Sequence, residues 1–383
     1  MLTVGFFYGS SGSQGFEGVQ EVIREAVLEY KRRNPDAVVQ FEEGLRKEDY
    51  PEWLMTKYLA GKEPDVFLVG QAELQALAEK EMLMPLSKEA VEGGLYASLV
   101  DACRREGELL ALPVMCDPEM MAVQEDLVRE YAGELPDRSW QWGDFHQMCR
   151  QCTGTGREAG ETHRYGVRGY TWEMAAVSNA AEIFDESGKH NYLDSRGCVQ
   201  AVNFQYRLSA LETDTVNFDS GRLAFSPMWV SEYRKYSSWP HKIEKYNSFS
   251  WSCTTMPAGP AGSNISRTEL LSAAVSRRSS HREEAVEFLE ILAGCRTVQQ
   301  AVLDKTWCLP ASEEILQEPS AGLLRGECLL FDTMLHSASV IRRFDGYEDL
   351  VRRIDTEIEK AGAGTENFEI SLRRISRELT GNW

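Results

Sequence analysis

The residue whose type and position most clearly suggest a binding role is Trp229, at the end of the stretch Asn217–Trp229 (NFDSGRLAFSPMW). The mixed polar and apolar run over 222–226 predicts a half-buried strand, Ser226-Pro227 is expected to break it, and a helix should begin after Trp229. Side chains at the end of a strand in an α/β sheet face the region where such proteins bind ligands. Large aromatic residues are also common in cores, so both a ligand-stacking wall and a core anchor remain open for Trp229.

A second stretch, His146-x-x-Cys149-x-x-Cys152, combines residue types that bind zinc or carry out redox chemistry. On a helix, however, these three residues fan across the surface, and no second Cys-x-x-Cys or paired histidine follows. We therefore expect no metal site there.

Motifs of catalysis are missing from the sequence. It contains no Gly-x-Ser-x-Gly, no phosphate-binding loop and no dinucleotide fingerprint, so we expect neither an enzyme nor a bound cofactor. Carboxylates are so abundant that counting them does not exclude a glycosidase pair.

The charge balance restricts the possible partners. The 383 residues include 41 Lys and Arg against 60 Asp and Glu, which gives a net charge of −19. Such a surface repels nucleic acid phosphates and anionic membranes, so direct binding to either is disfavoured. No apolar run approaches the length of a membrane span, so we expect no membrane insertion. The N-terminal run over residues 2–8 is expected to be a strand rather than a signal peptide.

The nine cysteines are odd in number and irregularly spaced. A chain of this length does not need disulfides to fold, so most of them are expected to be free thiols, as in a reducing compartment.

Elements that must position these residues alternate between strand and helix. Strands are expected over 3–8, 38–41 and 65–69, and helices over 19–33, 53–59 and 74–81, where apolar residues recur at helical spacing. This order implies a mostly parallel sheet with right-handed crossovers. Strands are also expected over 109–114, 165–172 and 270–275, and the last fifty residues are expected to be helical.

Several short motifs, in order along nearly the whole chain, resemble the extracellular solute-binding proteins of family 1, the group that includes the maltose-binding protein. The motifs are Gly61–Phe67 (GKEPDVF), Ala111–Val114 followed by Asp117, Leu135-Pro136 with Trp140, Gly221–Phe225 with Trp229, Met256–Pro260 (MPAGP), Ser276 with Glu284-Ala285 and Phe288-Leu289, and Leu309-Pro310. Two positions depart from the family pattern. Ala122–Gln124 stands where a Tyr-Asn pair is usual, and the loop after Val69 offers Gln71 and Glu73 instead of the aromatic or acidic residues of several sugar binders.

The resemblance implies an α/β protein with the two-lobed periplasmic-binding-protein-like fold of type II. Each lobe would be a mostly parallel sheet flanked by helices, with the ligand held between the lobes by hinge closure. The expected first lobe comprises residues 1–112 plus 265–314, and the second comprises 113–264 plus 315–383. The chain should cross near Pro113 and return near 260–270.

A sugar needs hydroxyl, amide or carboxylate partners and flat aromatic rings. Besides Trp229, the residues that could supply them at strand ends and in loops are Tyr8, Ser10, Ser11, Gln14, Gln71, Asp117, Tyr170, Trp172, Trp251, Arg267 and Trp307. At least one of Tyr170 and Trp172 should face the ligand, and Arg267 could pair with an anionic one. The structural alternatives are a plain loop at 9–18, a turn at Asp117, core positions for Trp251 and Trp307, and a surface position for Arg267.

The expected function is binding of a small polar solute, foremost a carbohydrate, without chemistry. One role is the substrate-binding component of an ABC importer, with a membrane permease as partner, at the cell surface as a lipoprotein whose leader has been removed. The alternative, suggested by the nine cysteines, is a cytoplasmic ligand-sensing domain of a transcriptional regulator. A carbohydrate-active enzyme is the rival from another class.

Overall fold

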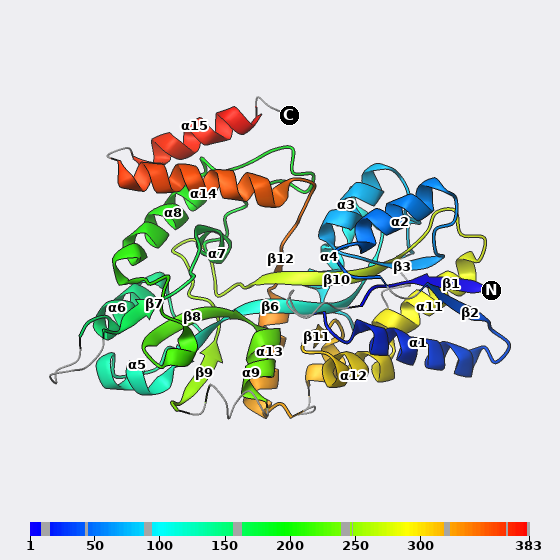
Figure 1. The fold of residues 1–383 in the computed structure, drawn as a ribbon, viewed down its shortest axis with the longest axis horizontal. Coiled ribbons are helices and arrows are strands. Elements are labelled where there is room, and N and C mark those ends of the chain that lie inside the picture. The colour runs from blue at the N-terminus through cyan, green and yellow to red at the C-terminus, as the bar shows by residue number, and fades with distance from the viewer. Residues whose placement is uncertain are drawn as a thin grey trace. The chain divides into compact units, whose positions relative to one another are not determined.

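The computed structural model describes residues 1–8, 16–42, 45–87, 94–155, 163–238, 246, 248–317, 322–364 and 367–380 (Figure 1). The chain forms two compact units. The first comprises Met1–Pro118 and Thr268–Asp345, and the second comprises Glu119–Arg267 and Gly346–Trp383. The chain therefore passes from one unit to the other three times.

The units differ from the expected lobes mainly in residues 315–345, which the structure places in the first unit. Helix α13 (Arg325–His336) packs there against α4 (Ala97–Asp101). Two hydrogen bonds join them: the Tyr96 hydroxyl donates to Asp332 Oδ1 at 2.7 Å, and Ser98 Oγ donates to the Leu335 carbonyl at 2.5 Å. These long-range contacts, which no local pattern reveals, hold α13 in the first unit.

The first unit is built on a mixed sheet. Strands β1 (Leu2–Gly5), β2 (Val39–Glu42) and β3 (Val66–Val69) are parallel, in the order β2-β1-β3. Strand β10 (Arg267–Val275) then pairs antiparallel with β3, and β6 (Leu112–Gln124) pairs antiparallel with β10. The parallel arrangement predicted from the sequence thus holds for β1–β3, whereas β10 and β6 make the sheet mixed.

The other elements of this unit surround the sheet or extend it. They are α1 (Val19–Arg33), α2 (Tyr50–Leu59), α3 (Gln71–Glu79), the β4–β5 hairpin (Arg104–Arg105 and Glu108–Leu109), α11 (Arg282–Gly294), α12 (Arg296–Lys305), β11 (Leu309–Pro310), η4 (Glu313–Leu316) and β12 (Ser339–Val340). Strand β11 pairs with β6, and β12 pairs with β10.

Helical periodicity identifies the core faces of α1 and α11 correctly. The six apolar residues predicted for α1 are its buried residues: Val19, Val22, Ile23, Ala26, Val27 and Tyr30. The four predicted for α11 are also buried: Ala285, Phe288, Leu289 and Leu292. The two helices pack against each other, and the centroids of the Tyr30 and Phe288 rings lie 5.7 Å apart in an edge-to-face arrangement. The apolar spacing in the sequence therefore predicts which faces of the two helices are buried.

The second unit contains its own mixed sheet. Strand β8 (Leu223–Trp229) pairs antiparallel with the last part of β6 and parallel with β7 (Tyr165–Val167), and β9 (Trp251–Thr254) pairs antiparallel with β6. The remaining elements are α5 (Glu125–Tyr131), α6 (Trp142–Cys152), α7 (Trp172–Ser178), α8 (Arg196–Leu208), η2 (Ser209–Leu211), η3 (Phe218–Ser220), α9 (Val230–Ser237), α14 (Tyr347–Ala363) and α15 (Phe368–Thr380). Helices α14 and α15 confirm the predicted helical C-terminal region.

Strand β8 runs through the predicted break at Ser226-Pro227. Pro227 lies opposite Met121 in the β6–β8 pairing, and that pairing continues to Trp229. The pairing with β7 involves Leu223 and Phe225, so no described strand pairs with the other edge of β8 at the proline. Proline is tolerated in a strand where one edge needs no amide donor. The strand therefore carries Trp229 to the start of α9, as expected, although by a longer route.

Strand β6 is also longer than predicted. It covers thirteen residues, all buried, instead of ending near Val114. Its second half includes Asp117 and Glu119, which are 1% and 3% exposed. Acidic residues interrupt the apolar pattern by which a buried strand is predicted. They can be buried only where groups distant in the sequence compensate their charge, so the pattern alone does not predict this part of the strand.

Candidate functional site

Trp229 is the last residue of β8 and lies directly before α9. Its backbone N–H donates to Glu232 Oε2 at 3.1 Å, so the helix start fixes the backbone of the tryptophan. The side chain is only half-buried, unlike the residues of the packed core. This combination of a fixed backbone and a partly open indole suits a stacking surface at the end of a strand.

Glu232 is the main polar group beside Trp229. Burial raises the pKa of its carboxyl, the Trp229 N–H lowers it, and the nearby Glu119 raises it again. Lys235, on the same helix, lowers the pKa and offsets part of this effect. A half-buried carboxylate with a raised pKa costs stability when it is ionised, and such costs concentrate at binding sites. Glu232 is therefore a candidate acceptor for ligand hydroxyl groups.

An aromatic cluster, here called the α9 cluster, surrounds this helix. The Trp251 ring lies 5.2 Å from Tyr233, 5.3 Å from Tyr246 and 5.8 Å from Phe218. Tyr236 stacks on Tyr246 at 4.9 Å, and Phe249 contacts Phe218 and Tyr246. Trp251, Tyr236 and Phe249 are half-buried, so the cluster keeps part of its ring surface open.

Carboxylates lie close to the tyrosines of this cluster. Burial raises the pKa values of the Tyr236 and Tyr246 hydroxyls, and Glu232 and Asp219 raise both further. Flat rings can stack on the C–H faces of a sugar, and the carboxylates beside them can accept hydrogen bonds from its hydroxyls. The second unit thus has the chemistry that a carbohydrate requires.

Arg267 is not available to an anionic ligand. Its guanidinium binds Glu119 through Nε and Nη2, each at 2.8 Å, and Nη1 lies 3.3 Å from Glu173 Oε2. Burial alone would lower the pKa of Arg267, but the two glutamates outweigh it and raise the value. The structure therefore corrects both expectations for Arg267, as a ligand partner and as a surface residue.

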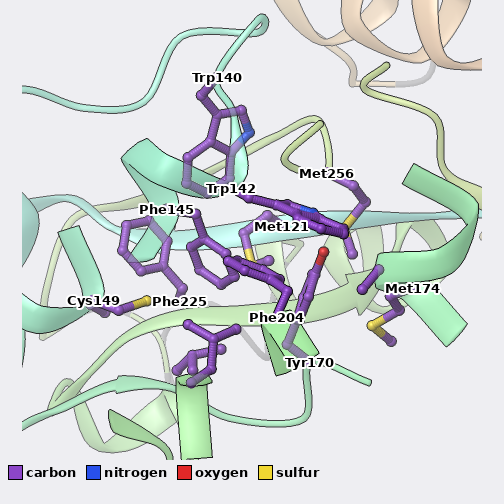
Figure 2. Close-up of a cluster of buried hydrophobic side chains, with 14 of the residues drawn as sticks. Met121, Trp140, Trp142, Phe145, Cys149, Tyr170, Met174, Phe204, Phe225 and Met256 are labelled. Carbon is purple, nitrogen blue, oxygen red and sulfur yellow. The ribbon is translucent and has the colours of Figure 1, made fainter. Parts of the chain in front are cut away.

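Tyr170 and Trp172 are both buried. Tyr170 is 1% exposed and belongs to a hydrophobic cluster with Phe145 and Phe204, and Figure 2 shows its hydroxyl directed towards the Trp142 indole. That hydroxyl lies near Ser178 and Trp142 without a hydrogen bond of ordinary geometry. Neither side chain of the pair offers the open ring face that was expected of at least one of them.

Trp172 starts α7 and packs in a separate cluster with residues of α14 and α15. Its Nε1 donates to Asp355 Oδ1 at 2.7 Å. Burial raises the pKa of Asp355, the Trp172 bond lowers it, and Glu173 raises it further. The predicted strand over 165–172 accordingly ends at Val167, because Thr171 caps a helix instead.

The first unit contains four described candidates: Tyr8, Gln71, Asp117 and Trp307. Tyr8 is half-buried just after β1, and its N–H donates to the Leu45 carbonyl at 2.8 Å. Trp307 is half-buried after α12. Asp117 is fully buried inside β6 rather than in a turn. Ser10, Ser11 and Gln14 lie outside the described residues.

Gln71, the first residue of α3, follows the end of β3 and is 4% exposed. Its Oε1 accepts from Arg105 Nη2 at 2.9 Å. Because arginine only donates, this bond leaves the Gln71 amide nitrogen as a donor, and that nitrogen has no hydrogen-bond partner among the described residues. The neighbouring Glu73 is occupied by the Gly70 N–H at 3.0 Å. Gln71 is therefore held in place beneath the surface, with one unused donor.

Cys149 and Cys152 belong to the hydrophobic cluster of Figure 2 and are both fully buried. Burial raises the pKa of Cys149 well above its usual value and that of Cys152 to about 12. Thiols in this state pack as apolar side chains. Among the described residues, no group of three or more His, Cys, Asp or Glu side chains is arranged to hold a metal ion.

Comparison with known proteins settles the family. Residues 9–294 match the sequence profile of the bacterial extracellular solute-binding proteins. The chain belongs to this family. Its members bind solutes, so the chain is a binding protein rather than an enzyme. Within the described residues, no helix combines the length and apolar character needed to cross a bilayer.

Individual relatives are distant. An uncharacterized lipoprotein of the oleD 5′ region of Streptomyces antibioticus is 24% identical over 384 residues, covering 89% of this chain and 80% of that protein. The sugar-binding protein MalE of Xanthomonas citri matches with a TM-score of 0.79 at 18% identity, over 99% of this chain and 96% of the other. A cyclic α-maltosyl-1,6-maltose binding protein of Arthrobacter globiformis also gives 0.79, at 15% identity over 99% and 98%. These structures show the fold of this solute-binding protein.

The sequence predicts Trp229 and Trp251 as candidates, but not Glu232 or the tyrosines of the α9 cluster. Glu232 had a readable signal, because an acidic residue three positions after a helix cap is typical of a capping box. The clustering of Tyr233 and Tyr236 with Phe218 and Trp251 had none, because it depends on how α9 packs against β9 and η3.

Proposed function

We propose that this solute-binding protein is a carbohydrate receptor whose second unit contacts the sugar through Trp229, Glu232 and the open edge of the α9 cluster. The observation that supports this most is the pairing of a half-buried indole with a half-buried carboxylate of raised pKa at the end of β8. The similarity of the fold to receptors described as sugar-binding and as binding cyclic α-maltosyl-1,6-maltose points the same way. In the first unit, Tyr8, Gln71 and Trp307 remain candidates.

The biological role that fits best is substrate delivery to an ABC importer. The family is extracellular, and the relative from Streptomyces antibioticus is a lipoprotein. We therefore favour a membrane permease as the partner and a lipid-anchored position at the cell surface. The alternative of a cytoplasmic sensor rests on the nine cysteines. Most of them are buried, and buried thiols are protected from oxidation even outside a reducing compartment. The cysteines therefore argue only weakly for a cytoplasmic location.

A thermal-shift panel tests the proposal on the full chain. The panel contains maltose, maltotetraose, cyclic maltosyl-maltose and tagatose, with an amino acid mixture and a dipeptide as non-sugar controls. A sugar that binds only the folded protein raises Tm by mass action, by an amount that grows with its concentration. Each sugar that produces a shift is then incubated with the protein for a day and examined for turnover. Shifts by amino acids alone, or conversion of a sugar, would overturn the proposal.

A further inference from the structure

Four side chains of the second unit form one buried polar cluster, here called the connector clamp. Arg267 holds Glu119 through two hydrogen bonds of 2.8 Å and lies 3.3 Å from Glu173. The Tyr347 hydroxyl donates to the other oxygen of Glu173 at 2.8 Å. A single guanidinium therefore links two glutamates, and one of these glutamates holds a tyrosine.

The clamp is well shielded from water. The side chains of Arg267, Glu119 and Glu173 are 13%, 4% and 13% exposed. Two-point contact between a guanidinium and a carboxylate fixes distance and orientation together. Removal of the cation would leave two buried carboxylates without a counter-charge, which proteins tolerate poorly. The clamp is consequently a rigid connection rather than a loose surface pair.

The position of these residues along the chain gives the clamp its significance. Glu119 is the first residue of the second unit on β6, and Arg267 is the last one before β10 enters the first unit. Tyr347 is the second residue after the third passage. The clamp thus ties together all three connectors, the segments by which the chain passes between the units, on the side of the second unit.

The first unit ties the same connectors on its own side. Thr268 lies opposite Pro118 in the β10–β6 pairing, and the Ile341 N–H donates to the Thr268 carbonyl at 2.9 Å. Arg343 forms an ion pair with Glu269. In the first unit, therefore, the third connector is attached to β10 and β10 is attached to β6.

Little of each connector remains outside these two sets of ties. On β6 the remaining stretch is the peptide bond between Pro118 and Glu119. On β10 it is the peptide bond between Arg267 and Thr268. On the third connector the remaining stretch is the exposed pair Asp345 and Gly346, and Gly346 has a φ of 79°, a left-handed conformation that glycine adopts without strain. We propose that the connector clamp makes the three connectors leave the second unit as one rigid body, so that bending is confined to these short stretches. This inference does not depend on the identity of the ligand.

Hydrogen exchange of the full chain, without ligand, tests the clamp through Arg267→Met. The matched control is Arg374→Met. Arg374 belongs to the same unit and also lies between two glutamates, at 3.2 Å from Glu357 and 3.7 Å from Glu378, but it is 44% exposed. In R267M, exchange should become about tenfold faster in residues 119–124, 263–267 and 347–351 together, while α8 keeps its protection. In R374M these three segments should exchange as in the wild type.

Two further variants keep the test decisive if R267M folds poorly. Tyr347→Phe removes only the bond to Glu173, so it should loosen 347–351 and leave 119–124 unchanged. Arg267→Lys keeps the charge but not the two-point contact, so it should give intermediate exchange in all three segments. Faster exchange confined to one connector in R267K, or uniform acceleration across the second unit including α8, would show that Arg267 is an ordinary core ion pair.

Discussion

At the scale of single residues, Trp229 carries the largest share of the proposed binding energy. An indole over a sugar ring buries C–H surface and fixes the orientation of the ring, so Trp229→Ala should weaken binding of the best sugar by about 2 kcal/mol, or roughly thirtyfold. Calorimetric titration gives the affinity, and thermal unfolding without ligand gives the stability. If Trp229 were instead a core anchor, its loss would cost about 3–5 kcal/mol of stability with affinity unchanged.

The matched control for this variant is Trp53→Ala. Trp53 is also half-buried, but it stacks on Tyr50 in the first unit and is not among the candidate site residues. Its loss should lower stability without changing sugar affinity. Equal losses of affinity in both variants would contradict a specific role for Trp229.

Glu232 gives a prediction with a defined pH dependence. Its folded-state pKa is raised, so the ionised form is disfavoured by folding, and its contribution to stability is lost as pH rises through that pKa. Glu232→Gln keeps the acceptor for the Trp229 N–H and removes the charge. At pH 7 its Tm should exceed that of the wild type by about 1–2 °C, and the difference should vanish as pH falls to the ordinary glutamate range near 4.5.

The same variant separates stability from function. If the Glu232 carboxylate accepts ligand hydroxyl groups, E232Q should bind the sugar more weakly although it is more stable. A variant that gains stability and keeps full affinity would remove Glu232 from the site.

The cysteines provide a test of burial. Cys253 and Cys295 are half-buried and the other seven are buried. Burial raises the pKa of Cys103 to about 12 and that of Cys198 to about 11, so little reactive thiolate is present at neutral pH. A disulfide-exchange reagent at pH 8 should label no more than two thiols quickly in the native protein, and all nine after denaturation without reductant. Fewer than nine in the denatured state would reveal disulfides.

At the scale of elements, the sequence predicts well what depends on local periodicity. The buried faces of α1 and α11 follow from apolar spacing, and the junction between β8 and α9 follows from the sequence up to Trp229. It predicts poorly what depends on pairing across the chain. Strand β6 extends past Val114 because Glu119 finds Arg267, which lies 148 residues away.

The candidate site residues also differ in whether their surroundings could be predicted from the local sequence. The position of Trp229 between a strand and a helix could be predicted from the sequence, whereas the burial of Tyr170 and Trp172 could not, because it is set by α8, α14 and α15. The pairing of Arg267 with two glutamates could not be predicted from the sequence, because neither Glu119 nor Glu173 lies near Arg267 in the chain. The return of the chain between Arg267 and Thr268 lies within the expected range of 260–270, whereas the first crossing lies at Pro118–Glu119 rather than near Pro113.

At the scale of the whole molecule, two units joined by three connectors are suited to a receptor that closes on its ligand. A sugar bound by residues of both units would hold them together, because only the closed arrangement makes both sets of contacts. The bending should then be confined to the stretches beside the connector clamp.

Small-angle X-ray scattering of the full chain, with and without a saturating sugar from the thermal-shift panel, tests this central claim most directly. The sugar should reduce the radius of gyration, and the same sugar at equal concentration should leave W229A larger than the wild type because that variant is less occupied. A profile that does not change at a sugar concentration shown by calorimetry to saturate the wild type would contradict closure on the ligand.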